Sequence, residues 1–289
     1  MTNVLLATCT GWPDGEPGAP ALEQALTARG LSSRWVAWDD ETVDWSKADA
    51  VAVRSTWDYV NRYAEFVTWA REVERETVLL NGADVFAWNL DKAYLAHLDG
   101  VPAVPTMTAD SVAELADGVR RFGTAVVKPR VGGGGSGVLV FDDPDDPNLG
   151  RAEHEHPLLP RPEGPWVVQP LVESVRTEGE TSVFVLGGRA VSQVDKLPAG
   201  DEIRVHEHFG GSSRPVPLRP ECADLATEAC TAASRKLGRT LHYGRVDMMR
   251  LADGSLAVSE LELIEPGLYL DVLPGNAEPF AEMVARTVS

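Results

Sequence analysis

The stretch VVKPRVGGGGSGVLVF, residues 126–141, decides the fold of this chain because it sets glycines between two apolar runs. Gly132, Gly134 and Gly137 have the G-x-G-x-x-G spacing of a dinucleotide-binding turn. Such a turn needs a helix directly after the glycines, whereas residues 138–141 are apolar and lack helical periodicity. A P-loop would need Lys and Ser or Thr there, and a linker would not have strands on both sides. We therefore predict a β-hairpin with a glycine loop at its tip.

A glycine loop of this kind can act as a lid over a nucleotide. Glycine has no Cβ, so the backbone N–H groups of the loop can approach phosphate oxygens closely. Lys128 lies at the base of the predicted hairpin, where its ammonium group can reach the same phosphates. We expect the loop to be mobile without nucleotide and ordered over the phosphates when ATP and Mg²⁺ are bound.

Composition limits the classes of partner. The chain has 289 residues, of which 44 are acidic and 26 basic, giving a net charge of −18. Such a charge repels nucleic acids and anionic membranes, so we expect neither as a partner. Cys9, Cys222 and Cys230 lack metal-site spacing, and no stretch resembles a signal peptide or a membrane span. We expect a folded cytoplasmic protein, which could form a homodimer.

The first ninety residues alternate between strand-like and helix-like patterns. Strands are expected at residues 4–7, 34–38, 49–54 and 77–80, and helices at 19–29 and 61–74. This alternation predicts a Rossmann-like parallel sheet with helices on both faces.

Polar side chains follow the third of these strands. Ligands of parallel sheets bind beyond the carboxyl ends of the strands, which makes this segment a candidate substrate site. It offers a cation, hydroxyls, an aromatic ring and a carboxylate, on Arg54, Ser55, Thr56, Trp57 and Asp58. The alternative is that Trp57 only packs and that Arg54 pairs with Asp58 at the surface.

Beyond residue 90 the pattern becomes a mixture of helices and antiparallel strands. Helices are expected at residues 91–98, 111–122, 221–237 and 277–288, and further strands at 166–169, 181–186, 189–194, 243–251 and 255–263. The acidic, proline-rich residues 142–165 predict an exposed loop. We expect an α/β fold, α+β in its C-terminal part, with three units: an N-terminal substrate domain (1–90), a central subdomain with the glycine loop (91–168) and a C-terminal subdomain with a metal site (169–289).

Four charged residues lie on the two arms of the last predicted hairpin. Alternation in a strand places Arg245 and Asp247 on one face, and Glu260 and Glu262 likewise. Three carboxylates in one place repel each other unless a cation lies among them, and oxygen ligands suit Mg²⁺. The alternative is a solvated sheet face with ordinary surface acids.

Taken in order along the chain, these motifs resemble the ATP-grasp ligases of the glutathione-synthetase and ribosomal S6-modification branch. The resemblance covers roughly residues 85–270, and the N-terminal part fits the domain that usually precedes an ATP-grasp fold. Its motifs are Asp91-Lys92, Lys128-Pro129, Gln169-Pro170-Leu171-Val172, Gly179-Glu180, Lys196, Arg245-x-Asp247 and Glu260-x-Glu262 with Pro266. The segments NLDKAYL, VRSTWDY, DEIRVHEHFGG and ELELIEPGLYL are also similar to a subgroup of small ATP-grasp proteins that includes the D-cycloserine-forming cyclo-ligase.

The resemblance implies roles for individual residues. Those that would hold ATP are Lys92, Lys128, Gly133, Gly134, Ser136, Gln169, Leu171, Val172, Lys196 and Arg204, with Glu173 or Glu180 on the ribose. Asp247, Glu260 and Glu262 would ligate two Mg²⁺ ions, although many relatives have Asn where Glu262 stands. Arg245, with Lys128 and Lys196, would stabilise developing negative charge. His206 and Glu265 would lie near the substrate; alternatively, His206 is a solvated loop residue.

The activity implied by the resemblance is that of a carboxylate–amine ligase. A small amino-acid-like substrate would be activated by ATP as an acyl phosphate, with release of ADP and phosphate, and an amine would then attack. This chemistry brings two anions together and needs water excluded, which suits a site with cations, Mg²⁺ and a closing lid. The sharper expectation is cyclisation of O-ureido-D-serine to D-cycloserine, an antibiotic. A small-molecule kinase, an intermolecular amino-acid or dipeptide ligase, and a non-catalytic nucleotide-binding module are the alternatives.

Overall fold

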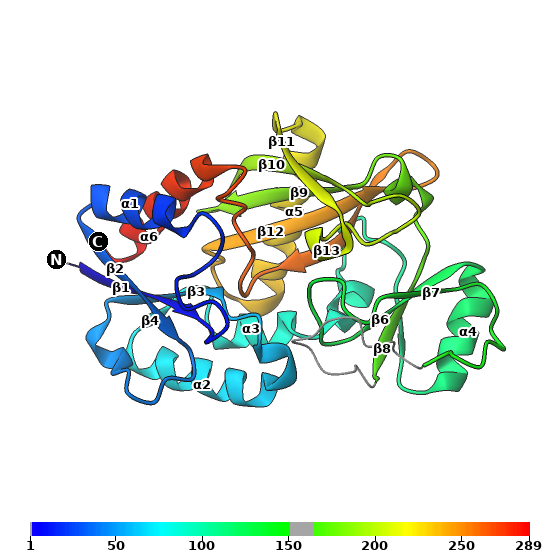
Figure 1. Cartoon of the computed structure of the whole chain (residues 1–289), viewed down its shortest axis with the longest axis horizontal. Coiled ribbons are helices and arrows are strands. Elements are labelled where there is room, and N and C mark those ends of the chain that lie inside the picture. Colours follow the sequence, from blue (N-terminus) through cyan, green and yellow to red (C-terminus); the bar gives the residue numbers. More distant parts are fainter. Residues whose placement is uncertain (1, 151–163) are drawn as a thin grey trace.

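The computed structural model describes residues 2–150 and 164–289, which form three β-sheets (Figure 1). The N-terminal sheet is parallel throughout, with strand order β2-β1-β3-β4. Its strands are β1 (Thr2–Thr8), β2 (Leu31–Ala37), β3 (Ala50–Ser55) and β4 (Val78–Leu79). The Rossmann-like sheet predicted from the sequence is confirmed.

Helices cover both faces of this sheet. Leu5 and Val53 share one hydrophobic core with helices α2 (Tyr63–Glu76) and α3 (Ala83–Asn89). Leu6, which points to the other face, shares a second core with α1 (Ala19–Ala28) and the C-terminal helix α6 (Ala277–Thr287). In Figure 1, α6 lies beside α1 although the two are separated by most of the sequence. The end of the chain thus completes the packing of its beginning.

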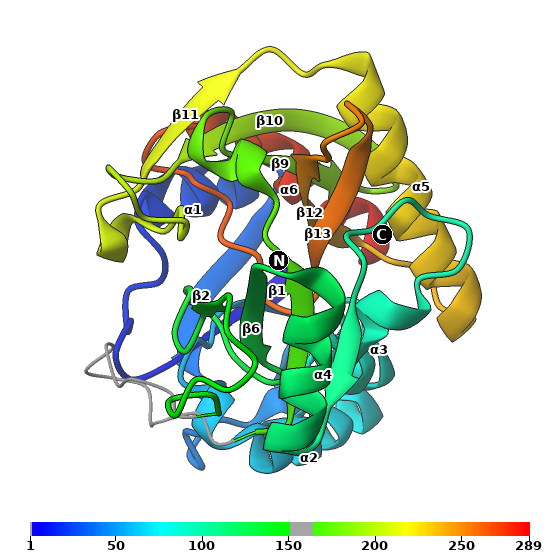
Figure 2. The same cartoon turned by 90° about the vertical axis from the view of Figure 1, so that its right-hand side faces the viewer.

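The C-terminal sheet is antiparallel, with strand order β11-β10-β9-β12-β13. Its strands are β9 (Glu180–Leu186), β10 (Arg189–Leu197), β11 (Ser212–Val216), β12 (Tyr243–Arg250) and β13 (Leu256–Glu262). Helix α5 (Pro220–Leu237) packs on one face of this sheet (Figure 2). Val183, Val246 and Leu261 of the sheet share a hydrophobic core with it. The opposite face carries polar side chains and forms the floor of the site described below.

The central sheet is smaller, with strand order β5-β8-β6-β7, and all of its pairs are antiparallel. Its strands are β5 (Met107–Ala109), β6 (Ala125–Pro129), β7 (Leu139–Phe141) and β8 (Trp166–Pro170). Helix α4 (Val112–Phe122) covers it and begins after Ser111, whose hydroxyl accepts a hydrogen bond from the Glu114 amide. This unit has a hydrophobic core of its own. The glycine residues connect β6 to β7, as the hairpin prediction required.

Several short elements differ from the prediction. The helix expected at residues 91–98 is a 3₁₀-helix, η3 (Lys92–His97), and α3, β5 and β11 were not predicted. Five further 3₁₀ turns are η1 (Trp45–Lys47), η2 (Tyr59–Asn61), η4 (Glu173–Arg176), η5 (Glu207–Phe209) and η6 (Pro274–Asn276). Residues 151–163 of the predicted loop lie outside the described residues, as does residue 1. Of the helices in the described ranges, none has the length and apolar character needed to cross a membrane.

Candidate active site

A cavity of about 790 Å³ lies where the three sheets approach each other. The N-terminal domain contributes Trp12 and Trp57, and the central subdomain contributes Lys128 and the glycine loop. The polar face of the C-terminal sheet supplies the rest of the wall, including Asp247 and Glu260. The volume falls within the range of sites that enclose a nucleotide or a drug-sized ligand.

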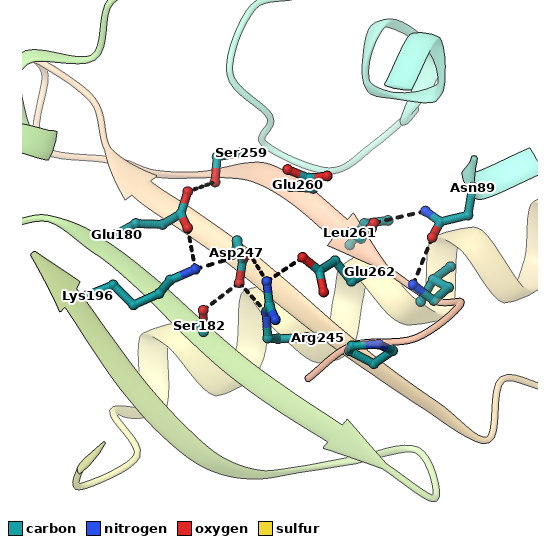
Figure 3. Close-up of polar contacts among 12 residues, drawn as sticks. Asn89, Glu180, Ser182, Lys196, Arg245, Asp247, Ser259, Glu260, Leu261 and Glu262 are labelled. Carbon is teal, nitrogen blue, oxygen red and sulfur yellow. Dashed lines mark hydrogen bonds and ion pairs between the residues drawn. The ribbon is translucent and has the colours of Figure 1, made fainter. Parts of the chain in front are cut away.

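Asp247 is the centre of a charged cluster on the sheet face (Figure 3). Arg245 binds its carboxylate with both ends of the guanidinium, at 2.9 Å from Nε to Oδ1 and 2.8 Å from Nη2 to Oδ2. The Ser182 hydroxyl donates to Oδ1 at 2.6 Å, and the Lys196 ammonium lies 3.3 Å from Oδ2. Arg245 also pairs with Glu262, which lies directly opposite it on β13. The strand register thus confirms that the four charged residues of the hairpin share one face.

Burial distinguishes this cluster from a solvated sheet face. Asp247 is 3% exposed, Lys196 4% and Arg245 7%. Burial alone would raise the pKa of the Asp247 carboxyl, but the charges of Arg245 and Lys196 outweigh it and hold that pKa well below its usual range. Burial and the neighbouring carboxylates raise the pKa of Glu262, against the opposing charge of Arg245. The alternative of ordinary surface acids is therefore excluded.

Glu180 joins the cluster at the start of β9. Its Oε1 lies 2.5 Å from the Lys196 ammonium, and its Oε2 accepts a hydrogen bond from Ser259 at 3.0 Å. Gly179, just before it, has φ +79°, and a Cβ there would lie only 1.9 Å from the carbonyl oxygen of Lys196. Only glycine fits this close approach, which explains the Gly179-Glu180 pair in the sequence.

Lys92 connects the sheet to the glycine loop. Its ammonium lies 2.7 Å from Glu260 Oε1 and donates to the carbonyl oxygen of Gly132 at 2.7 Å. Burial alone would raise the pKa of Glu260. The positive charges of Lys92 and Lys128 outweigh burial, so this pKa lies below its usual value. Burial lowers the pKa of Lys128, and in the described part of the chain its ammonium has no hydrogen-bond or ion-pair partner. Lys128 is therefore a cation available to an anionic ligand.

Strand β13 is held in place from outside the sheet. Asn89 donates to the Leu261 carbonyl at 2.9 Å and accepts from the Leu263 amide at 2.8 Å (Figure 3). The Tyr94 hydroxyl accepts from the Leu261 amide at 2.7 Å. These hydrogen bonds pair backbone groups at the free edge of β13. They thereby hold the strand in the position in which the side chains of Glu260 and Glu262 line the cavity. Neither Asn89 nor Tyr94 was predicted, since nothing in the sequence indicates which side chains reach a distant edge strand.

The donor chemistry of the three acids fits Mg²⁺, because all are carboxylates on paired strands and Asp247 lies opposite Glu260. In the ranges 2–150 and 164–289, however, no group of three or more His, Cys, Asp or Glu side chains is placed closely enough to hold a metal. Asp247 pairs with Arg245 and Lys196, Glu260 with Lys92, and Glu262 with Arg245. We expect a metal bound by these three acids to replace some of these ion pairs.

The predicted adenine site lies at the end of β8. Gln169, Leu171 and Val172 all line the cavity, and the Gln169 amide donates to the Thr106 hydroxyl at 2.9 Å. Of the two ribose candidates, Glu180 lines the cavity, whereas Glu173 does not and has an exposed side chain that pairs with Arg176. The structure thus brings Glu180 to the site and leaves Glu173 outside it.

The glycine loop contacts the segment that precedes β11. Gly134, Gly135 and Gly137 have positive φ angles of 59°, 74° and 70°. A Cβ at Gly135 would lie 3.1 Å from the Phe209 ring and 3.4 Å from the Arg204 side chain. The predicted nucleotide ligands of the loop, Gly133, Gly134 and Ser136, line the cavity, as do Arg204 and His206. Two chain segments thus meet over its mouth.

The structure corrects the predicted substrate role of Arg54, Ser55 and Thr56. All three are fully buried and none lines the cavity. Arg54 donates to Glu16 at 2.6 Å and 3.1 Å and to the Pro266 carbonyl at 2.6 Å, so it does not pair with Asp58 either. The reason is that β3 is buried on both faces: the Ser55 hydroxyl hydrogen-bonds to that of Thr8 at 2.7 Å, and the Arg54 guanidinium lies 4.9 Å from the centroid of the Phe280 ring. Arg54 is a structural link between the first domain and the loop after β13.

The next two residues do face the cavity. Trp57 packs edge-on against Trp12, with ring centroids 5.1 Å apart, and both rings line the wall. Asp58 also lines it and accepts a hydrogen bond from the Trp38 indole at 2.8 Å. Glu265 lines the wall too, as predicted. Glu16 was missed: its sequence context, a loop rich in glycine and proline, gives no sign that it is buried against Arg54.

The arrangement defines a class. A glycine loop on a small antiparallel sheet faces the charged side of a larger antiparallel sheet across a nucleotide-sized cavity, behind a Rossmann-like domain. This architecture is that of an ATP-grasp enzyme.

Comparisons with known proteins agree with this class. Residues 91–241 match the family model of the prokaryotic glutathione synthetase ATP-grasp domain, and residues 4–81 match that of the D-cycloserine synthetase DcsG N-terminal domain. The cycloserine biosynthesis protein DcsG of Streptomyces lavendulae is 32% identical over 280 residues, 92% of each chain. The chain belongs to the ATP-grasp ligases and is an enzyme that forms C–N bonds.

Solved structures show the same fold. The crystal structure of D-cycloserine synthetase DcsG superposes with a TM-score of 0.85 at 29% identity, covering 99% of this chain and 100% of that one. D-alanyl-alanine synthetase A from Vibrio cholerae shares the fold at a TM-score of 0.65 and 14% identity, over 99% and 97% of the two chains. The reading as a non-catalytic nucleotide-binding module is thereby ruled out.

Proposed function

We propose that this enzyme uses ATP and Mg²⁺ to activate the carboxylate of a small amino-acid-like substrate as an acyl phosphate, and that a nucleophilic nitrogen then attacks the acyl carbon and displaces phosphate. The sharper form of the proposal is cyclisation of O-ureido-D-serine to D-cycloserine in the cytoplasm, in which the oxygen-bound ureido nitrogen attacks and water removes the carbamoyl group as CO₂ and NH₃. It is supported by the 32% identity to DcsG over 92% of both chains, since that protein is named for cycloserine biosynthesis.

One observation carries the proposal. Lys128, Lys196 and Arg245 converge on a cavity that also contains the carboxylates of Asp247, Glu260 and Glu262. Transfer of a phosphoryl group to a carboxylate needs several cations near two anions, and it needs water to be excluded.

Residues of this chain then take separate roles. Lys128 and Lys92 hold phosphate oxygens, and Arg245 stabilises negative charge on the carbonyl oxygen of the substrate. The glycine loop closes the cavity against water. Asp247, Glu260 and Glu262 would hold Mg²⁺, which would supply positive charge to the phosphate groups.

A substrate screen tests this function. The purified enzyme is incubated with ATP, Mg²⁺ and O-ureido-D-serine or other amino acids. The nucleotide products are separated by chromatography, and the mass of the organic product is measured by mass spectrometry. ADP and phosphate with a new C–N bond are expected. AMP and pyrophosphate would exclude the acyl phosphate, and a phosphorylated product without a C–N bond would identify a kinase. Lys128→Ala and Glu260→Ala should abolish turnover while circular dichroism stays unchanged.

A further inference from the structure

Five acids of the cavity wall each have a cationic partner. The pairs are Glu16 with Arg54, Glu180 with Lys196, Asp247 with Arg245, Glu260 with Lys92, and Glu262 with Arg245. Pairing of this kind is what a carboxylate removed from water requires, because an unpaired buried charge costs several kcal/mol.

Glu265 is the exception. It lines the same cavity and is only partly exposed, but within residues 2–150 and 164–289 no Lys or Arg forms an ion pair with it. Burial raises the pKa of Glu265, and the Tyr59 hydroxyl as a hydrogen-bond donor and the more distant charge of Lys92 oppose the rise. Three other wall acids have no ion pair within the described residues: Asp58 and Glu207 accept hydrogen bonds from Trp38 and Ser213, and Asp271 is exposed to solvent. Glu265 is thus a carboxylate of the wall that is shielded from solvent and has no cation of the described chain paired with it.

The loop that carries Glu265 is fixed. Arg54 donates to the carbonyl oxygen of Pro266 at 2.6 Å, and the Leu268 amide donates to Glu16 at 2.6 Å. Tyr59 is itself held by stacking on Phe66, with ring centroids 4.7 Å apart. A carboxylate on such a rigid support is already placed for a ligand before the ligand arrives.

The surroundings of this loop suit a cation. A Cβ on Gly267 would lie 3.9 Å from the Trp57 ring and 4.0 Å from Glu16, so Trp57 lies beside the same loop. The faces of tryptophan rings attract cations, and Trp57 with Trp12 forms the aromatic part of this wall.

We propose that Glu265, oriented by Tyr59, binds the protonated amino group of the substrate and makes the enzyme selective for substrates with a free amine. This inference rests on the proposed function, which supplies an amino-acid-like substrate for the same cavity. Glu265 is then a specificity-determining residue and Tyr59 a positioning residue. The ammonium group of the ligand completes the set of ion pairs in the wall.

The test compares two probes that differ in one group. O-ureido-D-serine carries the α-amine, and 3-(ureidooxy)propanoic acid lacks it. In the wild type we expect KM to be about 10- to 100-fold lower for the amine-bearing probe, the effect of a hydrogen bond to a charged group. Glu265→Gln should raise KM for that probe by a similar factor and leave KM for the other probe and for ATP unchanged. Tyr59→Phe should give a smaller rise in the same KM, with little change in kcat.

Glu228→Gln is the matched control, because it makes the same chemical change on the exposed face of α5. Equal KM values for both probes in the wild type, or equal effects of Glu265→Gln on both, would overturn the inference. If neither probe is turned over, calorimetry with the same two compounds tests the role of Glu265 separately from the proposed function. Preferential binding of the amine-bearing probe that Glu265→Gln removes would keep the inference while the proposed function fails, and absence of that preference would overturn the inference as well.

Discussion

The ammonium group of Lys92 lies 2.7 Å from Glu260 on strand β13 and 2.7 Å from the carbonyl oxygen of Gly132 at the start of the glycine loop. One side chain therefore connects an acid that we assign to Mg²⁺ with the loop that we assign to the phosphates. Binding of the metal ion to Glu260 would free Lys92 to turn toward an anion, so the two events are expected to support each other.

Replacement of Lys92 by Met tests this connection. The variant loses the cation but keeps most of the apolar stem, so we expect the Kd for ATP in the presence of Mg²⁺ to rise at least about tenfold, as for a lost charged hydrogen bond. Titration calorimetry measures the Kd. Lys47→Met is the control, because the Lys47 side chain is exposed and pairs with Asp44 at the surface. An unchanged Kd in Lys92→Met would contradict the assignment.

The glycine loop should become ordered when nucleotide binds. We expect amide hydrogens of residues 132–137 to exchange quickly in the free enzyme and at least about tenfold more slowly with ATP and Mg²⁺ bound, because closure removes them from water. Hydrogen exchange followed by mass spectrometry measures this, with exchange on α5 as an internal reference. Equal exchange in both states would show that the loop is not a lid.

Much of the fold could be predicted from local patterns. The hairpin of β12 and β13 followed from alternation in the sequence, which also placed Arg245 and Asp247 on one face; that Arg245 lies opposite Glu262 is known only from the structure. β5 and β11 were missed because they are short edge strands whose hydrogen bonds come from a neighbour rather than from their own pattern. The parallel sheet could also be predicted from the sequence, since its strands alternate with helices.

The site was only partly predictable for a related reason. Lys92, Lys128, Asp247 and Glu260 belong to motifs and were found. Arg54 was placed wrongly, because its partner Glu16 lies 38 residues away and the contact exists only after the sheet has formed. The pairing of each acid with its own cation is likewise a tertiary property that spacing along the chain does not reveal.

The buried pair of Arg54 and Glu16 should stabilise the fold. Removing one partner leaves an uncompensated buried charge, so Arg54→Met or Glu16→Gln alone should lower the free energy of unfolding by about 3–5 kcal/mol. The double variant should lose clearly less than the sum of the two. Urea unfolding of all four proteins completes the cycle. If the two effects are simply additive, the pair does not act as a unit.

Glu265 predicts a dependence of stability on pH. Burial raises its pKa to about 7 from the ordinary value of 4.5, although the hydrogen bond from Tyr59 opposes the rise. Between these pH values the folded protein keeps a proton that the unfolded chain has lost, so the free energy of unfolding contributed by this group falls as pH increases. Glu265→Gln removes that contribution.

The stability of Glu265→Gln relative to the wild type should therefore increase from about pH 5 to pH 7 and become constant above about pH 8. Urea unfolding at unit intervals of pH measures the difference. Glu228→Gln should show no such trend. A difference that shrinks as pH rises would mean that Glu265 is stabilised as a carboxylate in the folded protein.

The hydrophobic cores bear on how enzymes of this design can diversify. The N-terminal domain shares two cores with the C-terminal sheet and α6, whereas the sheet of β5 to β8 and helix α4 pack on a core of their own. The unit from β5 to β8 of a relative could therefore be exchanged with little change to the other two cores. The N-terminal domain could not, because Leu6 of β1 and Leu22 of α1 pack in one core with Phe280 of α6. We therefore expect changes in the N-terminal part of the substrate site to need matching changes in the C-terminal half, while the glycine loop can vary independently.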